Sequence, residues 1–113
     1  MEEKIIRNIF YYKHYYLDFF EQLKPEVKRK FNWTLKLIST VDMVPVKYFS
    51  HMTGTTGIFE VGTDIYRVFS FFDEGRIIIL VNGFQKKSQK TPKIEIELAE
   101  KLKKQYFDER ESE

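Results

Sequence analysis

Basic residues gather in one part of this 113-residue chain. Between Gly75 and Ile94 there are five basic residues and no acidic one, although the net charge of the whole chain is only +2. The five are Arg76, Lys86, Lys87, Lys90 and Lys93. A cluster of this kind is suited to neutralising phosphate groups, so the segment predicts a surface that binds a polyanion.

Arg67 precedes this segment and is expected to contribute to the same surface. The stretch Ile65–Phe72 alternates in the period-two pattern of a strand, which places Arg67 on the face opposite Tyr66 and Val68. The alternative is that Arg67 is an ordinary solvent-facing strand residue and that the lysines only keep a loop solvated.

Three other features are weaker candidates for chemistry. His51 lies in an expected loop, and an imidazole side chain is suited to proton transfer, although a hydrogen-bonded loop histidine is the commoner case. Tyr106 falls on an apolar helix stripe and is expected to pack there instead of acting as an acid. The basic run at 28–30 is expected to be a solvated helix face, with a contact to RNA as the alternative.

Composition limits the class of protein. The chain has no cysteine, which excludes a disulfide scaffold and thiolate chemistry. No His, Cys and carboxylate cluster has the spacing of metal ligands, so neither a metal nor another cofactor is expected. The longest apolar run, Ile77–Val81, is too short to cross a bilayer. We therefore expect one cytoplasmic domain over residues 1–113 that does not associate with membranes, with a disordered tail at 108–113.

The elements that must position the basic residues begin with a strand and two helices. β-Branched and aromatic residues predict a strand over Lys4–Tyr12. Apolar residues at helical spacing then predict helices over 16–23 and 25–38, and residues 41–57 have the glycine and proline content of a long loop.

Three strands and a final helix are expected to follow. The expected strands are Ile58–Val61, Ile65–Phe72 and Ile77–Asn82, the last of them central and covered on both faces. Thr91 is expected to cap a helix that runs to Tyr106. The fold class is therefore α+β: a small, twisted, mainly antiparallel sheet with two N-terminal helices and one C-terminal helix.

The order of these elements and four strings of residues resemble the RelE/HigB toxin superfamily, in its phage-derived, HigB-like branch. The strings are LDFFEQL, TGTTGIFEV, IYRVFSFFDEG and the highly characteristic NGFQKKSQKTPKIEIELA. The resemblance implies the toxin of a type II toxin–antitoxin system, a metal-independent endoribonuclease that cleaves mRNA on the ribosome and so inhibits translation. It also implies a helix-turn-helix antitoxin as a partner, besides the ribosome and mRNA.

The resemblance implies roles for individual residues. Arg67 matches the strand arginine of the family, and Lys86 and Lys87 match the basic position after the last strand, which implies catalytic roles in stabilising the charge of the transition state. Which of the two lysines points inward stays open. The remaining candidates are Lys90, Lys93 and Arg76 for RNA binding, and His51 and Tyr106 for proton transfer.

The chain departs from the family pattern after Val61. Family members continue this strand with an arginine and several more residues before the turn, whereas here Val61 is followed directly by Gly62, Thr63 and Asp64. The hairpin is therefore short and lacks that arginine. This departure favours an alternative hypothesis, a non-catalytic RNA- or antitoxin-binding module with a degenerate toxin fold.

Overall fold

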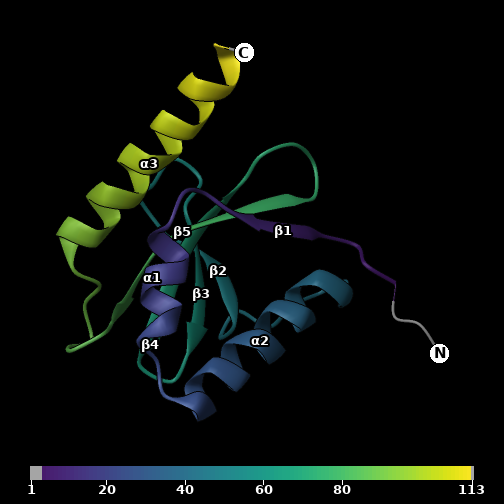
Figure 1. The fold of residues 1–113 in the computed structure, drawn as a ribbon, viewed down its shortest axis with the longest axis vertical. Helices are drawn as coiled ribbons and strands as arrows, with labels where there is room; N and C mark the ends of the chain where they lie inside the picture. The colour runs from purple at the N-terminus through teal and green to yellow at the C-terminus, as the bar shows by residue number, and fades with distance from the viewer. Residues whose placement is uncertain (1–3, 113) are drawn as a thin grey trace.

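The computed structural model describes residues 4–112, which form a five-stranded sheet with helices on both faces (Figure 1). The strand order is β1-β5-β4-β3-β2, in which β1 runs parallel to β5 and the other neighbours are antiparallel. The elements are β1 (Asn8–Tyr11), α1 (Tyr15–Glu21), α2 (Pro25–Thr40), β2 (Phe49–His51), β3 (Phe59–Thr63), β4 (Tyr66–Phe72), β5 (Ile77–Gln85) and α3 (Lys93–Glu111). The expected α+β class is confirmed.

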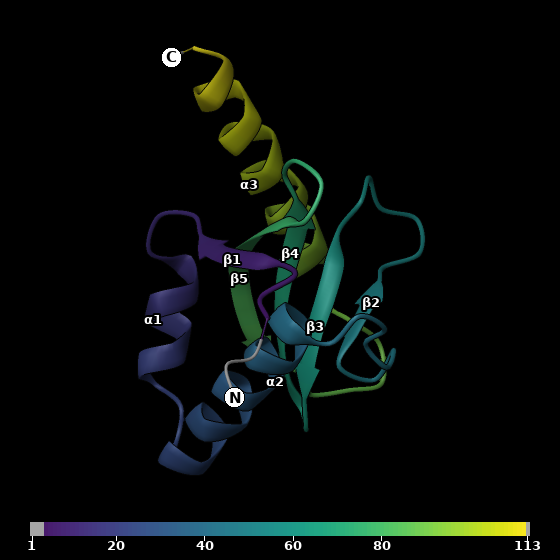
Figure 2. The same cartoon turned by 90° about the vertical axis from the view of Figure 1, so that its right-hand side faces the viewer.

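Hydrophobic residues form two clusters on opposite faces of the sheet. Strands place successive side chains on alternate faces, so β4 and β5 contribute to both clusters. One cluster packs Leu102 of α3 against Phe69 and Phe71, and the other packs Phe31 of α2 against Val68. The axes of α1 and α2 are inclined to each other, and the two helices are closest at the segment that connects them (Figures 1 and 2). The C-terminal turns of α3 extend beyond the sheet. β5 is covered on both faces as expected, although β4 is the middle strand of the five.

The strand boundaries differ from the sequence expectation in several places, and the strand expected to end at Asn82 continues to Gln85, where it pairs with Tyr66 of β4. The first strand is limited to Asn8–Tyr11, the part that pairs with β5. The expected loop at 41–57 contains the short strand β2, which became a strand because β3 offers it hydrogen bonds. β3 continues to Thr63, so the hairpin turns on Asp64 and Ile65 alone, with Asp64 in the left-handed region at φ +52°.

The final helix differs from the expectation at both ends. Its N-cap is Pro92, and no side chain caps it, so the expected capping role of Thr91 is wrong. The helix continues through the expected disordered tail to Glu111. Arg110 pairs there with Asp73 in the β4–β5 turn, which gives these last turns a tertiary anchor.

A bulge in β5 helps to position the end of that strand. Val68 pairs with Gly83 and Ser70 with Leu80, so the two β5 residues between these pairs face the single residue Phe69. One of the two is Asn82, which is buried and whose Nδ2 lies 3.0 Å from the backbone oxygen of Glu95 in α3. This bond therefore ties β5 directly to the first turn of α3.

Candidate nucleic-acid interface

Arg67 lies on β4, one residue after the hairpin turn, and its guanidinium is held in place. Nη1 donates to the backbone oxygens of Asp64 at 2.6 Å and Tyr66 at 2.8 Å. Nε lies 3.0 Å from Oε1 of Glu60, as an ion pair without hydrogen-bond geometry. The Arg67 side chain is 19% exposed, and its Nε is buried.

The structure places Arg67 on the expected face of the sheet. Tyr66 and Val68 pack in the cluster with α1 and α2, whereas Arg67 pairs across the sheet with Gly62 and Phe84. A Cβ at Gly62 would lie 3.4 Å from Cδ of Arg67. The glycine that follows Val61 therefore lets the arginine stem lie close to the β3 backbone.

The first lysines of the β5–α3 loop lie beside Arg67. Arg67, Lys86 and Lys87 line one open pocket of about 440 Å³, together with Asp64, Ile65, Ser88 and Gln89. The loop is fixed at its start, because the backbone nitrogen of Lys86 donates to the oxygen of Ile65 at 2.6 Å. Lys86 is half-buried and Lys87 is exposed. The three predicted catalytic residues are thus brought together, although their roles stay predictions.

The three residues predicted to bind RNA are distributed differently. Lys90 is exposed later in the same loop. Lys93 begins α3, with its Nζ 3.9 Å from a carboxylate oxygen of Glu97. Arg76 lies before β5, whereas Lys86 follows it, so the whole length of the strand separates Arg76 from the pocket.

The two candidates for proton transfer both lie away from the pocket. His51 is exposed at the end of β2, opposite Phe59, whereas Arg67 is opposite Gly62 near the other end of β3. The hydroxyl of Tyr106 lies 2.5 Å from Oδ2 of Asp73, in the turn between β4 and β5. Tyr106 therefore packs α3 onto the sheet, as its place on an apolar stripe indicates.

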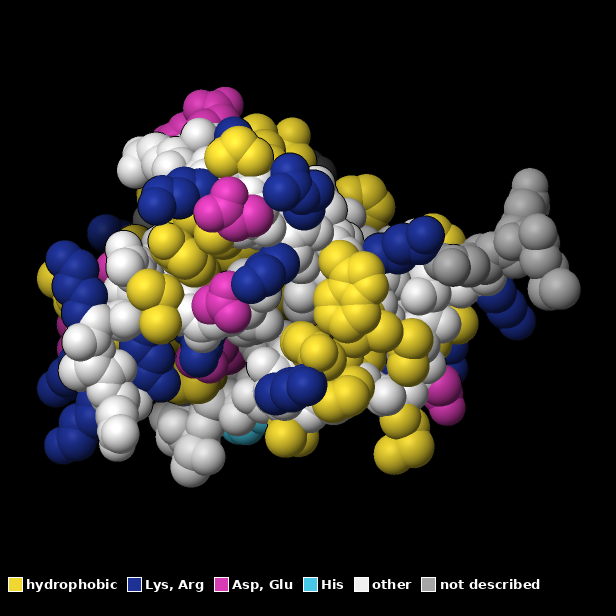
Figure 3. Space-filling model, turned by 90° about the horizontal axis from the view of Figure 1, so that it is seen from below, with side chains coloured by type: hydrophobic (Ala, Val, Ile, Leu, Met, Phe, Trp, Pro, Cys, Tyr) yellow, Lys and Arg dark blue, Asp and Glu magenta, His cyan; other side chains and the backbone are white. Residues whose placement is uncertain are grey.

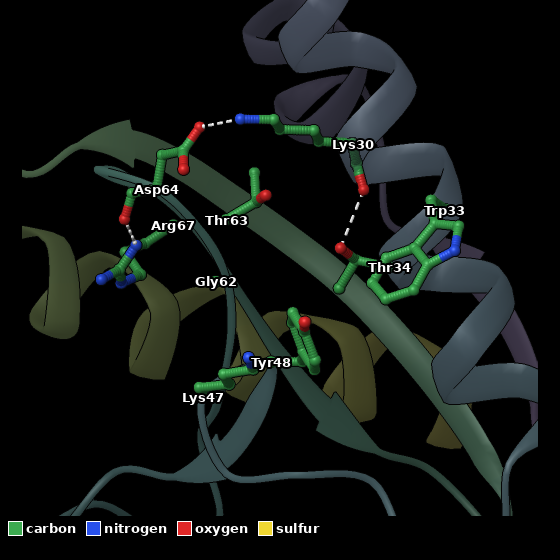
Figure 4. A pocket seen from close by; sticks show the side chains of 9 residues that line it. All are labelled: Lys30, Trp33, Thr34, Lys47, Tyr48, Gly62, Thr63, Asp64 and Arg67. Atoms are coloured by element: carbon green, nitrogen blue, oxygen red, sulfur yellow. Dashed lines mark hydrogen bonds and ion pairs between the residues drawn. The ribbon is translucent and has the colours of Figure 1, made fainter.

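A second pocket, of about 480 Å³, also has Arg67 in its lining (Figure 4). Asp64 and Arg67 line both pockets. Lys30, Trp33, Lys47 and Tyr48 also line the second one. Lys30 belongs to the basic run at 28–30, and its Nζ lies 2.7 Å from Oδ2 of Asp64, so this run is only partly a solvated helix face.

The sequence patterns did not single out the two aromatic residues of this pocket, Trp33 and Tyr48. The rings of Trp33 and Tyr48 meet edge to face with centroids 5.4 Å apart. Trp33 is the single tryptophan of the chain and lies between the polar residues Asn32 and Thr34, a local signal that could have singled it out. Figure 3 views this end of the molecule, where Lys and Arg side chains are spread around exposed hydrophobic ones.

Comparison with known proteins identifies the family. The model of the family "Phage derived protein Gp49-like (DUF891)" matches residues 18–104. The chain belongs to this family. The resemblance to the phage-derived branch of the RelE/HigB superfamily is thereby confirmed, and no curated protein matches the chain by sequence.

Two solved structures share the fold of this Gp49-like chain. The archaeal RelE-RelB complex from Pyrococcus horikoshii OT3 matches with a TM-score of 0.58 and 15% identity, over 72% of this chain and 96% of that one. The toxin-antitoxin complex RelBE2 from Mycobacterium tuberculosis matches with a TM-score of 0.51 and 12% identity, over 77% of this chain and 100% of that one. At these identities the matches establish the RelE fold.

The charges of the two pockets favour an anionic ligand for the Gp49-like chain. Five cationic side chains line them, and Asp64 is the acidic residue among the lining residues. The cations are Lys30, Lys47, Arg67, Lys86 and Lys87. Within residues 4–112, no helix has the length and apolar character needed to cross a membrane.

Proposed function

We propose that this Gp49-like protein is the toxin of a type II toxin–antitoxin system, and that it cleaves mRNA on the ribosome. Family membership and the RelE fold support the proposal. Both similar structures are complexes of a toxin with its antitoxin. The partner proposed for this chain is accordingly an antitoxin, with the helix-turn-helix type expected from the sequence resemblance.

The observation that carries the proposal is the convergence of Arg67, Lys86 and Lys87 on one pocket. When the 2′-hydroxyl of RNA attacks the neighbouring phosphate, negative charge builds up on the phosphorane oxygens. Fixed cations stabilise that charge, and they do so most effectively when they are oriented before the reaction. Arg67 meets this condition, because two backbone oxygens and Glu60 hold its guanidinium.

The same pocket contains a group that could accept a proton. Asp64 is exposed, and one of its carboxylate oxygens is paired with Lys30. In the proposed mechanism Asp64 takes the proton of the attacking 2′-hydroxyl, while Lys86 or Lys87 supplies a proton to the leaving 5′-oxygen. No metal takes part in these steps.

A second candidate function is a non-catalytic RNA- or antitoxin-binding module. The observation in its favour is that Glu60 already pairs with Arg67, since a phosphate would have to share the guanidinium with this carboxylate. The short hairpin, which ends at Asp64 and Ile65, also lacks the arginine that the family pattern provides.

Induction of the chain in bacterial cells separates the two functions. If the chain is the toxin, its induction is expected to arrest growth, and co-expression of the adjacent reading frame is expected to relieve the arrest. Purified translating ribosomes that are treated with the protein are expected to show cleaved mRNA. Normal growth at verified soluble expression, together with intact mRNA in the purified assay, would contradict the toxin proposal. Retained RNA or antitoxin binding in that case would support the non-catalytic module.

A further inference from the structure

The pocket between α2 and the β3–β4 hairpin combines aromatic rings with positive charge. Trp33 projects from α2 with 54% of its surface exposed, although the next residue, Thr34, is buried. The other face of this helix packs in the core. The exposed Trp33 ring is therefore a surface that a ligand can contact. The Tyr48 ring restrains Trp33 through their edge-to-face contact.

Cations surround this aromatic pair. Lys47 Nζ lies 4.8 Å from the centroid of the Tyr48 ring. Lys30 reaches the same pocket from α2, three residues before Trp33. A surface that joins a stacking ring to side chains that neutralise phosphate is characteristic of proteins that bind single-stranded nucleic acid.

The pocket shares two lining residues with the proposed catalytic pocket. Arg67 and Asp64 line both. A strand whose phosphate lies at Arg67 therefore has the lysine loop on one side and the Trp33 ring on the other. The volume of about 480 Å³ lies within the range of small-ligand sites, about 300–1,000 Å³, which is room for one unstacked base.

We infer that Trp33 and Tyr48 form a stacking site for one unpaired RNA base, next to the phosphate at Arg67. This inference rests on the proposed function for the identity of the strand as RNA. The site adds affinity without reading the identity of the base, because every base has a π face. Lys47 neutralises the phosphate of the stacked nucleotide, and Lys30, which pairs with Asp64, lines the pocket beside it.

The single tryptophan provides a direct test in the full-length protein. Binding of a ten-nucleotide single-stranded oligouridine or oligoadenosine RNA is expected to quench the selectively excited tryptophan fluorescence, which reports on Trp33 because the chain has one tryptophan. Inorganic phosphate at the same ionic strength leaves the fluorescence unchanged, since it carries no base. Quenching by the antitoxin and not by either RNA would overturn the inference and assign the pocket to a protein partner.

Variants of Trp33 test the stacking contribution. Trp33→Leu is expected to weaken the binding of labelled RNA by roughly tenfold. Trp33→Phe is expected to retain most of the affinity, because it keeps an aromatic ring. Phe10→Leu is the matched control: Phe10 is 56% exposed but lies on β1, away from the two pockets. The four proteins must show the same circular dichroism spectrum.

Cleavage on ribosomes separates failure of this inference from failure of the proposed function. Trp33→Leu raises the KM for ribosome-bound mRNA more than it lowers kcat, and Phe10→Leu changes neither. Cleavage by Trp33→Leu at the wild-type KM, together with wild-type tryptophan fluorescence that RNA does not quench, overturns the stacking site and leaves the endonuclease intact. Quenching by RNA without cleavage by the wild type supports the stacking site and contradicts the enzyme.

Discussion

The guanidinium of Arg67 and the carboxylate of Glu60 lie against each other on neighbouring strands, with Nε 3.0 Å from Oε1. Both side chains are mostly enclosed, with 19% and 16% of their surfaces exposed. The pair therefore fixes the direction of the guanidinium at the point where the two pockets meet. The rigidity of this arginine, and not only its charge, is what the proposed chemistry uses.

Arg67→Lys is expected to remove most of the cleavage activity. Lysine keeps the charge but loses the planar guanidinium, which the Asp64 and Tyr66 oxygens and Glu60 hold in one orientation. The expected loss in kcat/KM is about 30- to 1,000-fold, or roughly 2–4 kcal/mol, as when one preorganised donor is removed. The measurement is mRNA cleavage on purified ribosomes. Cleavage at the wild-type rate would show that Arg67 is only a surface residue.

Changing Lys86 and Lys87 together to Ala is expected to weaken RNA binding in a salt-dependent way. The logarithm of the binding constant falls with the logarithm of the salt concentration, by a slope of about 0.7 for each phosphate contact to a single strand. Loss of two contacts should therefore reduce the slope of the double variant by about 1.4. Fluorescence anisotropy of labelled RNA over a salt series measures this slope. A matched control changes Lys101 and Lys104, which are exposed on α3. If the salt slope of the Lys86 and Lys87 variant equals that of the Lys101 and Lys104 control, the loop lysines do not contact the RNA phosphates.

Gly83→Ala is expected to destabilise the fold. A Cβ at Gly83 would lie 2.4 Å from Cδ2 of Phe19, so α1 would have to move away from β5. Overpacking of this kind costs about 1–3 kcal/mol of unfolding free energy, which urea denaturation measures. In a Phe19→Leu background the cost should fall, because the ring that meets the new methyl group is gone. An equal cost in both backgrounds would contradict this account.

Stability is expected to depend on Tyr16 at high pH. Burial raises the pKa of Tyr16 to about 12, because the phenolate is poorly solvated in the core. The unfolded chain releases this proton near pH 10, so the stabilising contribution is complete below about pH 10 and is lost as the pH rises to 12. The melting temperature of wild type relative to Tyr16→Phe should therefore fall between pH 10 and 12. A constant difference across that range would show that the Tyr16 pKa is not raised.

Local sequence patterns already place several residues in the core. Tyr16 and Phe31 follow the helical spacing of apolar residues, and both are buried. Lys86 and Lys87 directly follow a strongly apolar strand, which is why their position beside Arg67 could be predicted. The lengths of elements were harder to predict: β2 exists because β3 pairs with it, and α3 is longer than expected because Arg110 reaches Asp73.

The sequence by itself determined the helices, the strands other than β2, the α+β class and the location of the basic loop, because periodicity and charge are local properties. Only the tertiary structure decided that Trp33 meets Tyr48, that Glu60 pairs with Arg67, and that Arg76 lies away from the pocket. These relationships depend on strand register and on the packing of α2 beside β3, and both are set by contacts between segments far apart in the chain.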